Sequence, residues 1–409
     1  MFLIRQSKPK DVQTFLRMAR MVYFINLPPN EQVISAKIQH SAKCFAHAAG
    51  VPEDVPVKKI RAKGSAASAG SGGAGGWAAA EHESEFFMFT MEELATGAVV
   101  GTSQVRCHQG GPGNPNWSMQ VSEKTFRSDP LSFRSTHLVG KLFGDETGPS
   151  EIGGLILQPS HRGHSARPGR FLSFVRFHFM GLFRDRFADR VLAEMMAPVT
   201  SEGDNIFWDH FGRKFIPVKY AEADRFCQHN RKFIPELLPK EEIYLSLFPL
   251  EVQNMVAVVS KETLPARRLL ESLGFTYRNF IDPFDGGPHL DAPTDAIPLV
   301  ATTRRVGLGK PVSADKCDAH GIVSVLADDG EFRAIECDFA GSERSIRLTP
   351  ESMELLSASA DTEAGVTPLN AEPTEQIPAV KTAKKPRVMA PNPARGSSAR
   401  SPKAKRSKV

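Results

Sequence analysis

The stretch SKETLPARRLLESLGF, residues 260–275, decides the fold class because it predicts a short helix that runs directly into a strand. Thr263 is a suitable N-cap, Pro265 falls in the first turn and Gly274 follows the last turn, and these residue types favour helix ends. Apolar residues at helical spacing give the helix one face for packing on a core: Ala266, Leu269, Leu270 and Leu273.

Helices and strands alternate on both sides of this stretch. Helices are expected at residues 10–20, 30–48 and 169–187, strands at 2–5, 151–158 and 190–199, and hairpins at 85–108 and 322–339. A helix and strand are expected within 205–216, a strand at NMVAVV (254–259), and irregular chain over 110–141. The order predicts an α/β (α+β) protein with a mixed sheet flanked by helices.

Bulk composition narrows the class of protein. The 409 residues allow two or three domains, and no uncharged apolar run of about 18 residues predicts a transmembrane helix. The beginning, MFLIRQSKPKDV, does not resemble a secretory signal, so a cytoplasmic location is expected. The five scattered cysteines indicate reduced thiols, and no spacing of His, Cys or carboxylates predicts a metal site.

Two segments lack the residues of a core. Residues 63–80 are rich in Gly, Ala and Ser and predict a flexible insertion, whereas residues 351–409 predict a disordered tail. The last 29 residues hold ten Lys and Arg and no acids, which leaves 41 basic and 46 acidic residues elsewhere. Such a tail binds phosphate non-specifically, but it has no aromatic residue for stacking, so a nucleic-acid function is not expected.

The stretch GGLILQPSHRGHSARPGRFLSF, residues 153–174, predicts a strand, a turn and a helix in the order that an acyl-CoA-binding site uses. A strand edge can pair with pantetheine amides, and the turn and helix N-terminus after it can hold a pyrophosphate. The candidate residues are Leu155, Ile156 and Leu157 on the strand and Arg162, Arg167 and Gly169 at the turn. The alternative is an ordinary strand–loop–helix with solvated arginines.

The helix of the opening stretch, A-x-x-L-x-x-x-x-G-F, resembles the last helix of the GCN5-related acyltransferases. Other segments resemble arginine N-succinyltransferases within that superfamily, and the similarity runs colinearly over about residues 1–350. They include LPPNEQVISAKI, SEIGGLILQP, FWDHFGRKF, FIPELLPKEEIY and FIDPFDGGPHL. The Arg-x-x-Gly-x-Gly signature of the superfamily is altered, because Arg167-Pro168-Gly169 stands in place of Gly-x-Gly.

The resemblance implies transfer of succinyl from succinyl-CoA to the α-amine of L-arginine, in arginine catabolism. It implies an acyltransferase-like domain at residues 1–245, a second, smaller acyltransferase-like or β unit at 246–350, and the tail at 351–409. Succinyl-CoA is then a co-substrate rather than a permanently bound cofactor. No membrane partner is expected, and a homo-oligomer is left open.

The resemblance also assigns residues of the site. It places a succinyl-CoA contact at Leu155 and a proton-donating His at position 260, where this chain has Ser260. Serine has no pKa near neutrality and cannot replace an imidazole. Either the reaction tolerates the loss, or another residue such as His289 replaces it, or the chain has another substrate or impaired activity. For His289 the alternative is an exposed loop histidine.

Carboxylates are the natural partners of the guanidinium of arginine. Glu151, Asp282 and Asp285 are the candidates, although Asp285 also fits the turn signature Asp-Gly-Gly-Pro. The leading interpretation is an arginine N-succinyltransferase. The alternative is a related acyl-CoA N-acyltransferase with a different amine acceptor or with impaired activity.

Overall fold

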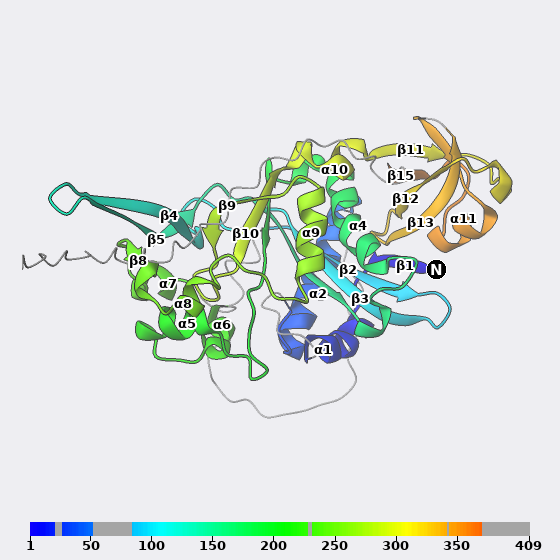
Figure 1. Cartoon of the computed structure of the whole chain (residues 1–409). Helices are drawn as coiled ribbons and strands as arrows, with labels where there is room; N and C mark the ends of the chain where they lie inside the picture. Colours follow the sequence, from blue (N-terminus) through cyan, green and yellow to red (C-terminus); the bar gives the residue numbers. More distant parts are fainter. Residues whose placement is uncertain (21–26, 52–83, 228–230, 342, 370–409) are drawn as a thin grey trace, which may run out of the picture. The chain divides into compact units, whose positions relative to one another are not determined.

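A mixed sheet runs through the part of the chain that the computed structural model describes, which is residues 1–20, 27–51, 84–227, 231–341 and 343–369 (Figure 1). Among these residues the strands follow the order β12-β15-β11-β14-β13-β1-β2-β3-β6-β7-β10-β9-β4-β5-β8. Their bounds are β1 Phe2–Gln6, β2 Phe86–Glu93, β3 Ala98–Arg106, β4 Asn116–Ser128, β5 Phe133–Asp145, β6 Ser150–Leu157, β7 Arg190–Glu194, β8 Ile243–Tyr244, β9 Thr276–Ile281, β10 Pro288–Pro293, β11 Arg304–Leu308, β12 Ala319–Leu326, β13 Phe332–Gly341, β14 Ser345–Arg347 and β15 Glu363–Pro368.

The helices lie between these strands and pack against them. Their bounds are α1 Val12–Arg20, α2 Glu31–Ala48, α4 Pro168–Leu182, α5 Ile206–His210, α6 Tyr220–Cys227, α7 Phe233–Leu237, α8 Leu250–Gln253, α9 Leu264–Ser272, α10 Pro298–Thr302 and α11 Pro350–Leu356. The sheet holds parallel and antiparallel pairs, so the predicted mixed α/β architecture is confirmed. No helix among the described residues is long and apolar enough to span a membrane.

Strand β2 shows why the centre of the sheet is covered on both faces. Its residues alternate in direction, so Phe86 and Met88 pack with α1 and α2, whereas Phe87 and Phe89 pack with the aromatic face of α4. All four side chains are buried. A strand covered on both faces reads as a continuous apolar run, which is why FFMF is recognisable from sequence.

A separate hydrophobic cluster holds the C-terminal strands together. It joins buried residues of β11 to β15 with Met353 and Leu356 of α11. Nearly all of α11 and the whole of β15 fall within residues 351–409, where the sequence predicts a disordered tail, and β15 pairs with β11 and β12. The predicted start of the tail is therefore wrong: Ala364 and Val366 are buried in this cluster despite the polar residues around them.

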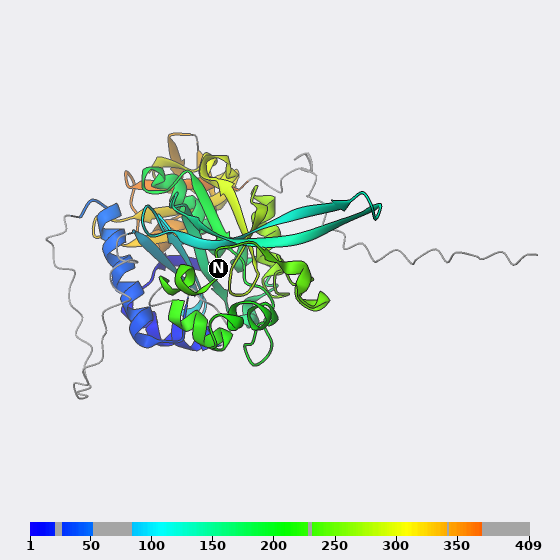
Figure 2. The same cartoon turned by 90° about the vertical axis from the view of Figure 1, so that its left-hand side faces the viewer.

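Three further segments differ from the sequence-based expectations. Residues 110–141 hold most of the long ribbon β4–β5, whose outer half is exposed and therefore lacks apolar alternation (Figure 2). NMVAVV forms turns rather than a strand, because Ala257 has a left-handed φ of 60° and its N–H donates to Gly286 O. After α5 the chain forms a 3₁₀ turn in place of the expected strand.

The division of the chain into domains is only partly addressed by these elements. The described residues up to 369 belong to one compact unit, and the predicted boundary at residue 245 stays a prediction. The predicted insertion at residues 63–80 and the basic segment from residue 381 lie outside the described residues.

Candidate active site

Strands β6 and β7 are parallel neighbours that separate after a short contact. They pair only at Ser150 with Val191 and at Glu151 with Leu192, whereas β6 continues to Leu157. On its other side β6 stays paired with β3 as far as Leu157. The β7 side of β6 is therefore an open strand edge whose backbone groups are available for a ligand. Leu155, Ile156 and Leu157 lie along this edge, as the sequence-based site requires.

A bulge at Gly154 marks the point where the two strands separate. Gly154 has a φ of 55°, and the register between β3 and β6 shifts between Thr102 and Gln104. A Cβ at Gly154 would lie 2.5 Å from the side chain of Gln104. Only glycine fits this position, so the bulge is built into the sequence.

The turn after β6 delivers the N-terminus of α4 beside this edge. Arg167 is the N-cap with a left-handed φ of 48°, Pro168 is the first helical residue and Gly169 follows it. The first N–H groups of a helix have no partners within it, and they favour anions. Arg162 and Arg167 are exposed, and neither pairs with a carboxylate among the described residues. The arrangement suits a phosphate group.

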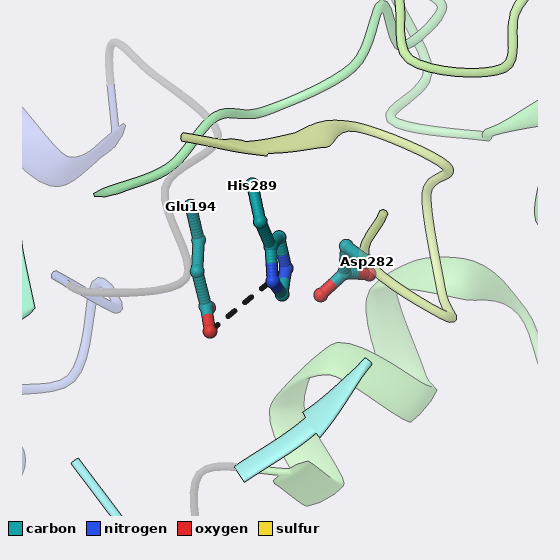
Figure 3. A group of neighbouring side chains, drawn as sticks. All are labelled: Glu194, Asp282 and His289. Atoms are coloured by element: carbon teal, nitrogen blue, oxygen red, sulfur yellow. Dashed lines mark ion pairs between the residues drawn. The ribbon is translucent and has the colours of Figure 1, made fainter. Parts of the chain in front are cut away.

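A partly buried cluster of titratable side chains lies where β7 and β10 meet (Figure 3). His289 of β10 is opposite Glu194 of β7 in the register, and its Nε2 lies 3.9 Å from Glu194 Oε1. Asp282, which follows β9, brings a carboxylate oxygen within 4.8 Å of ligand atoms of both. Asn116 of β4 donates a hydrogen bond to Glu194 at 2.9 Å, which fixes that carboxylate. A cluster of this composition can hold a cation or move a proton.

The carboxylates of this cluster repel one another. Burial, reinforced by the charges of Asp285 and Glu194, raises the pKa of Asp282 to about 7. Burial and the charge of Asp282 likewise raise the pKa of Asp224 to about 7. Burial also acts on Glu194, but His289, Arg231 and Asn116 outweigh it and hold the pKa of Glu194 below its ordinary value. A cationic guest would favour the ionised forms of Asp224 and Asp282, whose pKa values are raised.

The other predicted acceptor residues have different surroundings. Glu151 is buried with its Oε2 3.8 Å from Arg106 Nε, and burial together with the charge of Glu194 raises the pKa of its carboxyl. Both oxygens of Asp285 accept backbone hydrogen bonds, from Ala197 N–H at 2.9 Å and Gly287 N–H at 2.7 Å. Asp285 therefore holds the turn, whereas Asp282 presents an oxygen to the cluster.

Ser260 has a structural role in this fold. Its Oγ accepts a hydrogen bond from Thr263 N–H at 3.2 Å and lies 2.7 Å from Thr263 Oγ1, so it closes the turn that begins α9. Its own N–H donates to Met196 O at 3.1 Å, which anchors the turn to the end of β7. Only 4% of Ser260 is exposed. The predicted N-cap Thr263 makes no capping hydrogen bond through its own side chain.

The sequence analysis missed Glu194, Asp224 and Arg231. Glu194 ends the apolar run RVLAE of β7, and a charged residue that closes a buried strand at the sheet edge is a usable signal. Asp224 lies on α6 and Arg231 just before α7, in a segment whose packing only the fold reveals. Arg231 donates to Asn116 Oδ1 at 3.0 Å and so joins the same network.

An open strand edge, a helix N-terminus beside exposed arginines and a partly buried acidic cluster are features that an acyltransferase with an acyl-CoA donor and an amine acceptor would use. A family model described as arginine N-succinyltransferase beta subunit matches residues 71–299. This match covers more than half of the chain, which therefore belongs to the arginine N-succinyltransferase family.

Relatives support the same assignment. The chain is 33% identical over 296 residues to an arginine N-succinyltransferase of Yersinia pestis (strain Pestoides F), covering 71% of this chain and 84% of the relative. It is 31% identical over 320 residues to that of Shigella dysenteriae serotype 1 (strain Sd197), covering 77% and 83%. Both relatives carry the name that the resemblance of the sequence implied.

A solved structure has the same fold. Subunit AI of the arginine/ornithine succinyltransferase from Pseudomonas aeruginosa superposes with a TM-score of 0.70 at 24% identity. The superposition covers 91% of this chain and 99% of that subunit. At this identity the likeness establishes the architecture, and the site residues of this chain have to be argued from their own geometry.

Proposed function

We propose that this chain is an arginine N-succinyltransferase that transfers succinyl from succinyl-CoA to the α-amine of L-arginine, in arginine catabolism. The observation that supports the proposal is the open edge of β6, which has the N-terminus of α4 after it in the chain and the Glu194, Asp282 and His289 cluster at the end of the neighbouring strand β7. The helix end fits an anionic donor, and the cluster fits a cationic acceptor.

The donor side rests on backbone geometry. Succinyl-CoA, used as a co-substrate, would pair its pantetheine amides with the free edge at Leu155 to Leu157. Its pyrophosphate would lie against the N-terminus of α4, near Arg162, Arg167 and Gly169. The N–H groups of the β6 edge would then point at the thioester carbonyl and stabilise the oxyanion of the tetrahedral intermediate.

The acceptor side rests on charge. The acids interact in pairs: Glu151 with Glu194, Glu194 with Asp282, and Asp282 with Asp224. Cationic side chains act on them from Lys37, Arg106, Arg225, Arg231 and His289. The pKa values of Glu151, Asp224 and Asp282 stay raised all the same, so a cationic guest would favour their ionised forms. L-Arginine carries two cationic groups and one carboxylate. Its guanidinium can form bidentate hydrogen bonds with a carboxylate, which a primary ammonium cannot. Asp282 is the acid best placed for this contact, because Asn116 holds Glu194 beside His289.

A second candidate function uses the same site with another amine. The observation that favours it is Ser260, because the resembled family has its proton donor at that position. In this case the acidic pocket would hold a different diamine or amino acid, and the donor side would be unchanged. The expected cytoplasmic location and the open question of a homo-oligomer stay predictions under both functions.

One assay separates the two candidates. Purified full-length protein is mixed with succinyl-CoA and with L-arginine, L-ornithine, L-lysine or agmatine in turn, and released thiol is followed. The first proposal expects the highest kcat/KM with L-arginine and none with agmatine, which has no α-carboxylate beside its amine. Thiol release that L-arginine does not accelerate, with another amine active, would favour the second candidate.

A further inference from the structure

The histidine at the end of β10 has a buried ring nitrogen without a hydrogen bond. His289 is only 6% exposed, and its Nε2 has no hydrogen-bond partner among the described residues. Buried polar atoms are nearly always paired, because leaving one unpaired is costly. Figure 3 shows the ring between the side chains of Glu194 and Asp282. This nitrogen is therefore available to a group that binds beside Glu194 and Asp282.

Two carboxylates lie beside the ring of His289. Glu194 Oε1 lies 3.9 Å from Nε2, and Asp282 approaches from the segment after β9. A carboxylate beside an imidazole stabilises the imidazolium that forms during catalysis. Asn116 holds Glu194 in place at 2.9 Å, so this stabilisation does not depend on a mobile side chain.

His289 and Ser260 flank the same short segment. Met195 N–H donates to Pro288 O at 3.1 Å, and Ser260 N–H donates to Met196 O at 3.1 Å. The end of β7 thus lies between the strand that carries His289 and the turn that carries Ser260. Of the two side chains, only that of His289 has a functional group suited to proton transfer.

We propose that His289 is the proton-transferring residue of acyl transfer in this chain, with Glu194 as its positioning residue, in place of position 260. This inference rests on the proposed function. The ammonium of the acceptor first loses one proton to solvent, and the neutral amine attacks the thioester carbonyl carbon. As the C–N bond forms, Nε2 of His289 accepts the second proton from nitrogen. As the C–S bond breaks, the imidazolium gives this proton to the CoA thiolate, which leaves as the free thiol.

The test compares His289→Gln with Ser260→Ala in the full-length protein. Gln has a similar size but cannot transfer a proton, so kcat should fall at least about 100-fold with the KM for succinyl-CoA changed less than about threefold. Ser260→Ala should lower kcat by no more than about threefold, because the hydroxyl only closes a turn. A His289→Gln variant that keeps most of its kcat would overturn the proposal, and so would an equal loss from Ser260→Ala.

Rescue experiments guard against a loss that comes from misfolding. Added imidazole should restore at least about tenfold of the lost rate in His289→Ala, because the vacated space admits the free base. Ser260→His in the His289→Gln background should also restore activity, because it places an imidazole on the turn that contacts the chain just after β7. Failure of both rescues in variants that unfold like the wild type would mean that His289 does not transfer the proton.

The same three side chains also have a spacing that can hold a divalent cation. Wild-type protein is therefore assayed before and after treatment with EDTA and after addition of Zn²⁺. Unchanged activity supports proton transfer, whereas activity that EDTA abolishes and Zn²⁺ restores would assign His289 to a metal site and overturn the proposal. A wild type that releases no thiol with any amine would instead refute the proposed function.

Discussion

Two buried histidines of this chain have opposite surroundings. His178 of α4 is fully buried, and both ring nitrogens lie 2.6 Å from hydroxyls, Nδ1 from Thr367 Oγ1 and Nε2 from Ser324 Oγ. Burial lowers the pKa of His178 to about 3, so the ring stays neutral. His289 is nearly as buried, yet its Nε2 has no hydrogen bond and faces carboxylates.

The contrast distinguishes buried polar groups that stabilise the fold from buried polar groups that remain available to a ligand. His178 connects α4 to β12 and to β15, and β15 lies in the segment that the sequence predicted to be disordered. His289 contributes no such bond, and the acids around it repel one another. Changes near His178 should therefore act on stability, and changes near His289 should act on turnover and binding.

The largest expected loss of stability comes from His178→Leu. The substitution leaves the buried hydroxyl of Ser324 without its partner and removes one of the two side-chain contacts of Thr367, which keeps Thr303 Oγ1. The free energy of unfolding should fall by about 2 kcal/mol. Urea unfolding followed by circular dichroism measures it, and kcat per folded molecule should stay within about twofold. The matched control is His289→Gln, for which we expect a large loss of kcat and little change in the free energy of unfolding. A His178→Leu protein as stable as the wild type would contradict the stabilising role of His178.

Asp282→Asn should stabilise the protein, but only at high pH. The native carboxyl of Asp282, with a pKa of about 7, keeps a proton that the unfolded chain has already released near pH 4. Stability from this group therefore falls as pH rises from about 4 to 7 and stays low above that.

Asparagine avoids this loss and keeps the acceptor oxygen that receives hydrogen bonds from Phe284 N–H and Asp285 N–H. We expect a gain of about 2 kcal/mol at pH 8 and little change at pH 4. Urea unfolding at the two pH values measures it, and kcat/KM for L-arginine should fall at least about tenfold. An equal gain in stability at both pH values would contradict the raised pKa of Asp282.

Arginine binding should release protons near neutral pH. Asp224 and Asp282 both have a pKa of about 7, and a bound cation favours their ionised forms. We expect roughly half a proton to one proton released per arginine at pH 7. Calorimetry in buffers of different ionisation enthalpy measures the number. At pH 9 both acids are already ionised, so the release should vanish, and heats that do not depend on the buffer at pH 7 would contradict the acceptor pocket.

Local patterns of the sequence predicted the donor side of the site. The strand β6, the turn after it and the helix α4 are consecutive in the chain, so their order alone indicates an edge followed by a helix N-terminus. Helix α9 was predicted for the same reason, since its end signals and apolar spacing lie within one short stretch. The resemblance to the family added the position of Ser260.

The acceptor side could not be predicted in this way. Glu194, Asp282 and His289 meet because β10 pairs with β7 in one register, and a shift by one residue would turn His289 to the opposite face. The ribbon β4–β5, which carries Asn116 to Glu194, was missed because its exposed half has no apolar alternation. Contacts between distant strands and polar surface ribbons have no local signature.

The smallest expected effect concerns two exposed arginines that pair with no carboxylate among the described residues. Arg176 of α4 is buried and donates to Ser173, whereas Arg162 and Arg167 are exposed at the end of the same helix. Arg162→Ala and Arg167→Ala should each raise the KM for succinyl-CoA about fivefold, or about 1 kcal/mol, with unfolding unchanged. Arg134→Ala on the exposed ribbon is the matched control and should change neither quantity. With succinyl-pantetheine, which has no pyrophosphate, the two variants should match the wild type, and a rise in KM with this donor too would place the phosphates elsewhere.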